Sequence, residues 1–185
     1  VATAAVKVVP LDMAWDSFDD RYEGCGPNMT KELPALNCSD IRHNPLFAQV
    51  WNDSMKVWRN RGVPVSPLLS PAQAIAIMAY TMDDLYSDFN AAVREGGRSP
   101  QHYRDNFHYK TLHFLLTQAV VALRDTQKLN HGCVYRGVDG LQFKVKVGQR
   151  VRFGQFASAS PCESITHDFG TDTTFEVHTY HGAEI

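Results

Sequence analysis

The sequence predicts an α+β fold in which helices come first and strands follow. Apolar residues recur with a helical period over residues 112–123, whereas from residue 141 onwards they alternate with polar residues. Helices followed by strands are typical of an α+β fold and not of a doubly wound sheet. A chain of 185 residues suits one domain. We therefore expect a single domain over residues 1–185, with a mainly helical part over 1–130 and the beginning of a β core over 131–185.

Prolines and glycines divide residues 1–70 into short polar and aromatic segments. Breaks are expected at Gly26–Pro27, Pro34, Asn44–Pro45, Pro64 and Pro67. Residues 62–71 contain three prolines and predict a loop or an extended connector.

Serine followed by proline marks two helix starts, at Ser70 and at Ser99, because serine caps a helix and proline fits its first turn. The first of these helices is expected to carry the apolar positions Ile75, Ile77, Met78 and Leu85. A stop follows at Gly96–Gly97. The clearest helix is predicted from Leu112, with its apolar stripe at Leu115, Leu116, Ala119, Val120 and Leu123.

Residues 133–185 are expected to be dominated by strands. The alternating apolar positions are Leu141, Phe143, Val145 and Val147, then Val151 and Phe153, then Phe175, Val177 and Thr179. This period of two predicts strands that have one apolar face.

Composition and charge exclude several classes of partner. Apolar residues make up 44% and charged residues 21% of the chain, as in ordinary globular proteins. The net charge is −2, so we expect no nucleic acid partner and no polybasic membrane patch. No apolar run is long enough to span a membrane, and Val1–Pro10 does not look like a signal peptide. We expect a mature soluble form, with any signal or lipid anchor outside this chain.

The four cysteines predict no metal site, because the gaps between Cys25, Cys38, Cys133 and Cys162 match no zinc-binding spacing. Three glycosylation sequons begin at Asn28, Asn37 and Asn52. Together with an even number of cysteines, they favour an extracellular, oxidising location.

No familiar nucleotide-binding, zinc-protease or serine-hydrolase motif occurs in the sequence. The candidate site instead lies in two other segments. In the first segment, Arg136 lies on the same strand face as Val134 and Val138. A guanidinium on such a face needs an anionic ligand or a carboxylate partner, and the residues alone leave both readings open. Gly137 beside it permits close approach of a ligand.

The second segment places Ser158 and Ser160 on one face of an extended stretch. Two hydroxyls on one face could orient a carboxylate or a ribose. Ser160 also precedes Pro161 and Glu163 in the pattern of a helix-capping box, which we favour for Ser160, while the role of Ser158 stays open.

Several blocks of this sequence, in one order, resemble the vertebrate ecto-mono-ADP-ribosyltransferases, which are arginine-directed. The resemblance lies in Leu11–Ala14, Ser17–Asp20, Gly24–Cys25, Ala79–Thr81, Phe89–Arg94, Lys110–Thr117, Val134–Gly137 and Phe156–Ser160. It implies a helical N-terminal half packed on a mixed two-sheet core that binds NAD, with residues 131–185 as the start of that core. It also implies transfer of ADP-ribose from NAD to arginine-bearing acceptor proteins, without a metal, in a secreted or surface-anchored enzyme.

The family's arginine–serine–glutamate triad implies roles for named residues. Arg136 and Ser158 match the catalytic arginine and serine; Arg136 is expected to hold the NAD phosphates and Ser158 to orient the catalytic glutamate. Gly137 would contact the nicotinamide amide, and Phe169 would pack against the nicotinamide ring. Tyr80 and Gln155 are weaker candidates for lining the same site.

The sequence departs from the family in two respects. The family's Glu-x-Glu segment has no match here, and neither Glu176 nor Glu184 occupies its position, so we expect the chain as given to lack the C-terminal strands that carry it. Among the cysteines, the family partner of Cys25 falls beyond residue 185 and that of Cys133 falls at Tyr180, which leaves a bond between Cys133 and Cys162 as one alternative. An NAD glycohydrolase and a catalytically silent NAD-binding ectodomain remain alternative functions.

Overall fold

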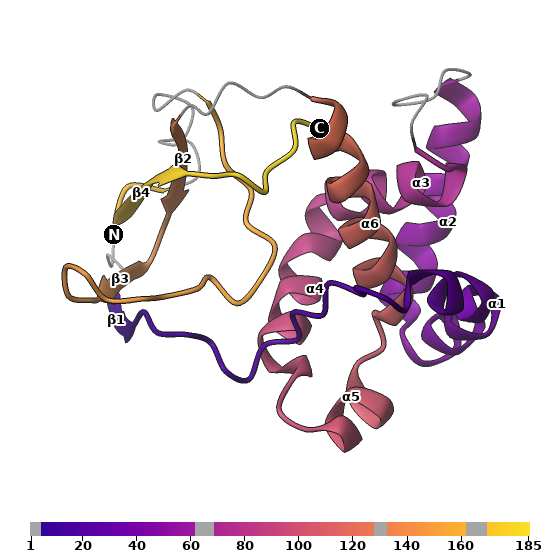
Figure 1. Ribbon diagram of the computed structural model, residues 1–185, viewed down its shortest axis with the longest axis horizontal. Coiled ribbons are helices and arrows are strands. Elements are labelled where there is room, and N and C mark those ends of the chain that lie inside the picture. Colours follow the sequence, from indigo (N-terminus) through magenta and orange to yellow (C-terminus); the bar gives the residue numbers. More distant parts are fainter. Residues whose placement is uncertain (1–4, 62–68, 128–132, 162–169) are drawn as a thin grey trace. The chain divides into compact units, whose positions relative to one another are not determined.

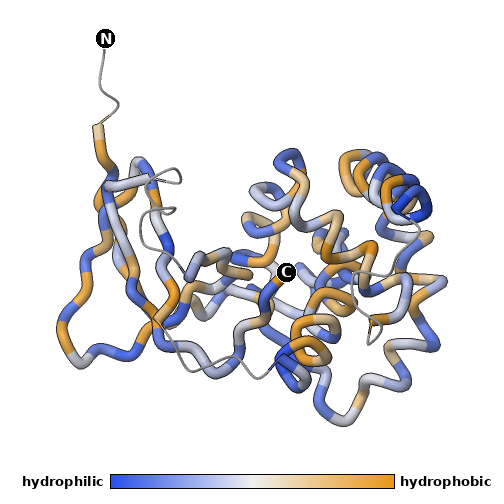
Figure 2. The backbone as a smooth tube through the Cα atoms, turned by 90° about the horizontal axis from the view of Figure 1, so that it is seen from above, coloured by the Kyte–Doolittle hydropathy of each residue, from blue (hydrophilic) through white to orange (hydrophobic). Residues whose placement is uncertain are grey.

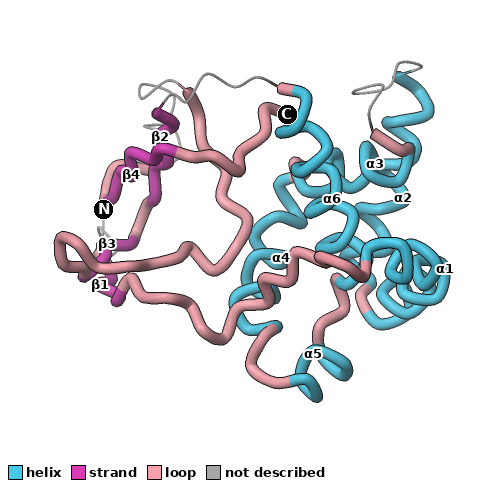
Figure 3. The backbone as a smooth tube through the Cα atoms, in the orientation of Figure 1, coloured by secondary structure: helices cyan, strands magenta, loops and turns pink. Residues whose placement is uncertain are grey.

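A computed structural model describes residues 5–61, 69–127, 133–161 and 170–185. The chain divides into two units, which are described separately. One contains Val1–Trp15 and Leu129–Tyr180, and the other contains Asp16–Lys128 and His181–Ile185. The described strands lie in the first unit and the described helices in the second (Figures 1 and 3). The α+β class is confirmed, while a single domain over 1–185 divided at residue 130 stays a prediction.

The core of the helical unit is centred on one largely buried helix. Its helices are α1 (Gly26–His43), α2 (Pro45–Arg61), α3 (Pro71–Tyr80), α4 (Asp83–Gly96), α5 (Pro100–Asn106) and α6 (Lys110–Thr126). Apolar and polar residues alternate along much of this unit (Figure 2), but every residue of α3 from Ala74 to Tyr80 is buried. Helix α3 packs against α2, α4 and α6. Phe47, Phe89 and Leu112 are fully buried in this core, and each stabilises the fold by roughly 1.5–3 kcal/mol.

The two serine–proline helix starts are confirmed. The Ser70 hydroxyl accepts a hydrogen bond from the Gln73 backbone N–H at 3.3 Å, and the Gln73 side-chain oxygen accepts one from the Ser70 N–H at 2.8 Å. Ser99 accepts from the His102 N–H at 3.0 Å. These bonds satisfy N–H groups that the first turn of a helix leaves without partners.

Two expectations about the helices are wrong. The helix from Ser70 ends at Tyr80, so Leu85 belongs to α4. The break arises because the Thr81 hydroxyl donates to the Met78 carbonyl, and because α4 begins with two acidic residues that favour a helix N-terminus. Pro34 lies inside α1 and does not end it. Its missing N–H removes one backbone bond, but the helix continues on both sides.

A buried histidine joins the segment before α1 to α6. His113 Nε2 lies 3.1 Å from the Phe18 carbonyl and therefore donates to it, so Nδ1 accepts from the Tyr22 hydroxyl at 2.8 Å. Burial lowers the pKa of His113 from 6.5 to about 4. The imidazole is neutral at physiological pH and acts as a structural hydrogen-bonding group.

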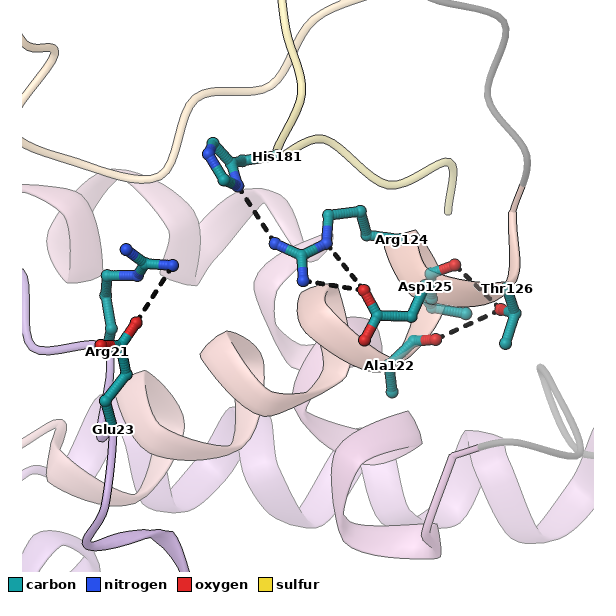
Figure 4. A network of polar contacts seen from close by, with 8 residues as sticks. Arg21, Glu23, Ala122, Arg124, Asp125, Thr126 and His181 are labelled. Atoms are coloured by element: carbon teal, nitrogen blue, oxygen red, sulfur yellow. Dashed lines mark hydrogen bonds and ion pairs between the residues drawn. The ribbon is translucent and has the colours of Figure 1, made fainter.

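The end of α6 binds the last residues of the sequence. Arg124 donates to His181 Nδ1 at 3.1 Å and forms an ion pair of 2.7 Å with Asp125 (Figure 4). The Gln127 side chain donates to the Glu184 carbonyl at 2.7 Å and accepts from the Glu184 N–H at 2.8 Å. The Gln127 amide thus makes two hydrogen bonds with the backbone of Glu184, as a residue of a neighbouring β-strand does.

Among its described residues, the strand unit contains two pairs of strands. Strand β1 (Lys7–Pro10) pairs in parallel with β3 (Leu141–Lys144), and β2 (Cys133–Val138) pairs antiparallel with β4 (Thr173–His178). The sequence did not predict β1. The strand unit has one parallel and one antiparallel pair among its described strands, which agrees with the expected mixed two-sheet core.

Strands occupy less of residues 133–185 than expected. Val145 and Val147 follow the end of β3 and are exposed, because a turn closed by a hydrogen bond from the Gln149 N–H to the Lys146 carbonyl interrupts the alternation. Val151 and Phe153 also lie outside strands. Between them, Arg152 donates from its backbone to Asp12 and from its side chain to Met13, so this segment holds the N-terminal stretch.

Cys25, Cys38 and Cys133 are free thiols in the structure, and Cys162 lies outside the described residues. Two of the sequon asparagines, Asn28 in α1 and Asn52 in α2, are exposed. Among the helices that the structure describes, none combines the length and the apolar character needed to cross a bilayer.

Candidate active site

Strand β2 is the centre of the candidate site because chain segments border it on both sides. On one side it pairs with β4, with Arg136 opposite Phe175 and Gly137 opposite Thr174. On the other side, Tyr135 exchanges two backbone hydrogen bonds of 2.8 Å with Ser160. The segment that contains Ser158 therefore runs antiparallel to β2.

The structure brings Arg136 and Ser158 together, as the sequence predicts. Arg136 Nη1 donates to the backbone carbonyl of Ser158 at 2.9 Å. The residues alone left a bound anion and a carboxylate partner as alternatives, and this contact, which is to a neutral oxygen, decides between neither of them. A carbonyl does not neutralise a guanidinium, and a guanidinium carries five N–H donors, so the contact is compatible with binding an anion as well.

Two glycines allow backbones to meet at the end of β2. Gly137 is buried within the strand. Gly170 has a φ of +121°, and a Cβ placed on it would lie 2.3 Å from the Asp139 nitrogen. Only glycine permits this approach.

Two further hydrogen bonds attach the segment after Gly170 to the turn that follows β2. The Gly140 N–H donates to Asp172 Oδ2 at 2.7 Å, and the Thr173 hydroxyl donates to the Leu141 carbonyl at 2.8 Å. Gly170 was not among the residues predicted for the site, although its place directly after Phe169 was a signal for it.

An aromatic cluster supports the face of β2 and β4 that carries Arg136. The ring of Phe175 lies 5.2 Å from that of Phe143 and 5.1 Å from that of Phe153, measured between centroids. The register places Phe175 directly opposite Arg136. The segment from Phe153 to Ser158 therefore contacts the strand pair at both ends, and Gln155, which is half-buried, lies between these contacts.

Phe169 and Tyr80 are the two remaining predicted site residues. Phe169 lies outside the described residues. Tyr80 belongs to the helical unit, where it is 7% exposed, accepts a 3.5 Å hydrogen bond from Asn90 and meets the ring of Phe89 edge-on. The roles of Arg136, Gly137, Ser158, Phe169, Tyr80 and Gln155 stay predictions.

Glu176 and Glu184 are the last two glutamates of the sequence, and they belong to different units. Glu176 pairs with Tyr135 in the register of β2 and β4. Because side chains alternate along a strand, Glu176 points to the face opposite that of Arg136. Glu184 is bound through its backbone to Gln127 in the helical unit. That neither glutamate supplies the catalytic carboxylate stays a prediction.

Comparison with known proteins places this arrangement in a family. Residues 11–185 match the family model described as "NAD:arginine ADP-ribosyltransferase". The chain is 46% identical over 180 residues to NAD(P)(+)--arginine ADP-ribosyltransferase 2 of Gallus gallus, covering 96% of this chain and 57% of that protein. It is 44% identical over 189 residues to GPI-linked NAD(P)(+)--arginine ADP-ribosyltransferase 1 of Mus musculus, covering 95% and 58%.

Solved structures agree with these matches. The crystal structure of the eucaryotic mono-ADP-ribosyltransferase ART2.2 matches with a TM-score of 0.74 and 34% identity, over 91% of this chain and 74% of that one. A mutant of ART2.2 in complex with NAD matches with a TM-score of 0.75 and 33% identity, over the same shares. The chain spans less than two thirds of the chicken and mouse relatives. By its sequence and its fold, the chain belongs to the NAD:arginine ADP-ribosyltransferase family.

Proposed function

We propose that this chain forms part of an enzyme that transfers ADP-ribose from NAD to arginine side chains of acceptor proteins and releases nicotinamide. The printed names of its chicken and mouse relatives describe this activity for those proteins. The mouse relative is named as GPI-linked. With three sequons in the first 54 residues, this supports an extracellular enzyme that is secreted or held by a lipid anchor.

The observation that carries the proposal is the contact between Arg136 and Ser158. These residues match the first two members of the family's triad, lie 22 positions apart in sequence and meet through a 2.9 Å hydrogen bond. The bond fixes the guanidinium beside the serine segment, so that a phosphate bound by Arg136 would lie next to the Ser158 hydroxyl.

The chemistry of the transfer assigns a task to each residue. Departure of nicotinamide leaves positive charge on the ribose, so the dinucleotide must be held in a bent and fixed position. Arg136 would bind the phosphates through charge-assisted hydrogen bonds. The backbone of Gly137 would bind the nicotinamide amide, with Phe169 against the ring and Gln155 and Tyr80 lining the site. No metal takes part in this scheme.

The acceptor imposes a second requirement. An arginine guanidinium is protonated at neutral pH and is a poor nucleophile until a carboxylate binds it and removes a proton. Ser158 would orient such a carboxylate. The family's Glu-x-Glu segment supplies this group, and the 185 residues hold no match for it, so we assign that step to no glutamate of this sequence.

The test compares two proteins incubated with NAD and an arginine-containing peptide, followed by mass spectrometry of the peptide. One is this chain, and the other is this chain joined to the segment of the chicken relative that follows the matched region, where the family resemblance implies the Glu-x-Glu segment. Transfer by the joined protein alone supports the proposal, and a Ser158→Ala version should then lose most of the rate. NAD hydrolysis without transfer would indicate the glycohydrolase. Binding without turnover by both proteins would indicate the silent NAD-binding protein.

A further inference from the structure

The face of the β2–β4 pair opposite Arg136 carries a cluster of metal-ligating groups. Cys133 lies directly opposite His178 in the register, and Glu176 is two residues from His178 on the same face. Cys133 Sγ lies 3.0 Å from Glu176 Oε1 and 3.5 Å from His178 Nε2. One ligand atom from each of the three residues lies within 4.8 Å of the other two.

We propose that Cys133, Glu176 and His178 form a binding site for a borderline divalent cation of the Zn²⁺ type. Thiolate, imidazole and carboxylate are the three ligand types that zinc takes in proteins. Hard cations such as Mg²⁺ and Ca²⁺ prefer oxygen ligands and would not select a thiol. The cysteine spacing alone could not reveal this site, because two of the three ligands come from the facing strand.

The distances suit one tetrahedral ion. With Zn–S near 2.3 Å and Zn–N and Zn–O near 2.0–2.1 Å, two ligand atoms on the same zinc lie roughly 3.3–3.6 Å apart. The two observed distances, 3.0 and 3.5 Å, need only small side-chain movements to reach this range. Glu176 and His178 are exposed, so an ion can enter from solvent and keep a water molecule as its fourth ligand.

Proton balance makes the binding pH-dependent. In the free site the Cys133 thiol donates a hydrogen bond to Glu176 Oε1 and therefore carries its proton. The cation replaces that proton, and binding of one ion releases one proton from the thiol. Affinity for zinc should therefore rise with pH.

The ion would join the two strands that hold the candidate active site. It lies near the start of β2, three residues before Arg136, but on the opposite face of the strand pair. It would stabilise the strand pair without occupying the side chains proposed to bind NAD. This inference stands on the positions of the three ligands and does not depend on the proposed transferase activity.

The experiment titrates this chain with Zn²⁺ in competition with a chelating indicator, and with Co²⁺ as a spectroscopic probe. We expect one ion per chain and a near-ultraviolet thiolate-to-Co²⁺ band. Glu176→Gln and His178→Gln should each weaken zinc affinity by at least about 10-fold, since even loss of a hydrogen-bond partner to a ligand costs that much. Cys133→Ser should abolish the Co²⁺ band. Cys38→Ser and His43→Gln, at exposed positions of α1, are the matched controls and should keep both signals.

Three results would overturn the proposal. The first is a loss of Zn²⁺ binding in Cys38→Ser or His43→Gln that is as large as the loss in the variants of the cluster. The second is a Co²⁺ spectrum without a thiolate band. The third is a disulfide between Cys133 and Cys162 in peptide mass spectrometry of the protein as secreted. Circular dichroism of each variant separates loss of ligand from loss of fold, and the Glu176 and His178 variants decide the matter if Cys133→Ser does not fold.

Discussion

Removal of His113 should change how the stability of the helical unit depends on pH. The imidazole is 3% exposed and held between the Tyr22 hydroxyl and the Phe18 carbonyl. Burial lowers its pKa to about 4, whereas in the unfolded chain it is near 6.5. Between these values the unfolded chain binds a proton that the folded chain does not, so stability falls as pH decreases from 6.5 to about 4.

The magnitude follows from the two pKa values. At about 1.4 kcal/mol per pH unit, the interval between 6.5 and about 4 corresponds to a loss of about 3 kcal/mol in the free energy of unfolding. The full contribution is present above pH 6.5 and is gone below about pH 4. Asp40 acts in the opposite sense, because burial raises the pKa of its carboxyl. Only a comparison with a His113 variant isolates the histidine.

The assay compares the urea unfolding of the parent chain and of His113→Gln at a series of pH values. The series runs from pH 7 to pH 4, roughly the interval set by the two pKa values. The variant should be less stable at pH 7 and should lose less stability on acidification, by about 3 kcal/mol over the range. Phe89→Ala, which removes a buried side chain but no titratable group, is the control: it should be less stable at every pH and keep the shape of the parent's pH dependence. Parallel pH profiles for the parent and His113→Gln would refute the reasoning.

Three other substitutions test the fold by urea unfolding. Ser70→Ala removes the capping box of α3 and should cost about 1 kcal/mol, and an unchanged midpoint would argue against the cap. Phe89→Ala empties a position with 0% exposure and should cost about 3–5 kcal/mol; a loss below 1 kcal/mol would show that the site is not packed as described. Gly170→Ala forces a Cβ against the Asp139 backbone and should destabilise the strand unit by roughly 1–3 kcal/mol. Gly148→Ala, with a φ of +83° but open space around it, is its control and should cost less.

Local signals in the sequence were sufficient to predict the ends of several helices. The serine–proline pairs at Ser70 and Ser99 and the glycine stop at Gly96 predicted boundaries because capping and chain reversal depend on neighbouring residues. Pro34 misled because a helix tolerates proline when tertiary packing maintains it. Strand β1 was missed because its pairing with β3 joins residues more than 130 positions apart.

The candidate site was predictable only in part. The strand period predicted one face for Arg136, Val134 and Val138, and the family resemblance named Arg136 and Ser158 as members of one triad. The structure adds the register opposite Phe175 and the hydrogen bond to Ser158. The residues alone did not show that Arg136 donates a hydrogen bond to the backbone carbonyl of Ser158. The cluster of Cys133, Glu176 and His178 was not predictable, because it depends on the register between β2 and β4.

The central claim is that Arg136 on β2 holds NAD, and calorimetric titration of NAD into this chain tests it most directly. Arg136→Lys should weaken NAD affinity by at least about 10-fold, because an ammonium cannot reproduce the planar, bidentate contacts of a guanidinium with phosphate. Arg150→Lys, at an exposed position of the same unit, should leave the affinity unchanged. Equal NAD affinity for the parent chain and Arg136→Lys would contradict the account.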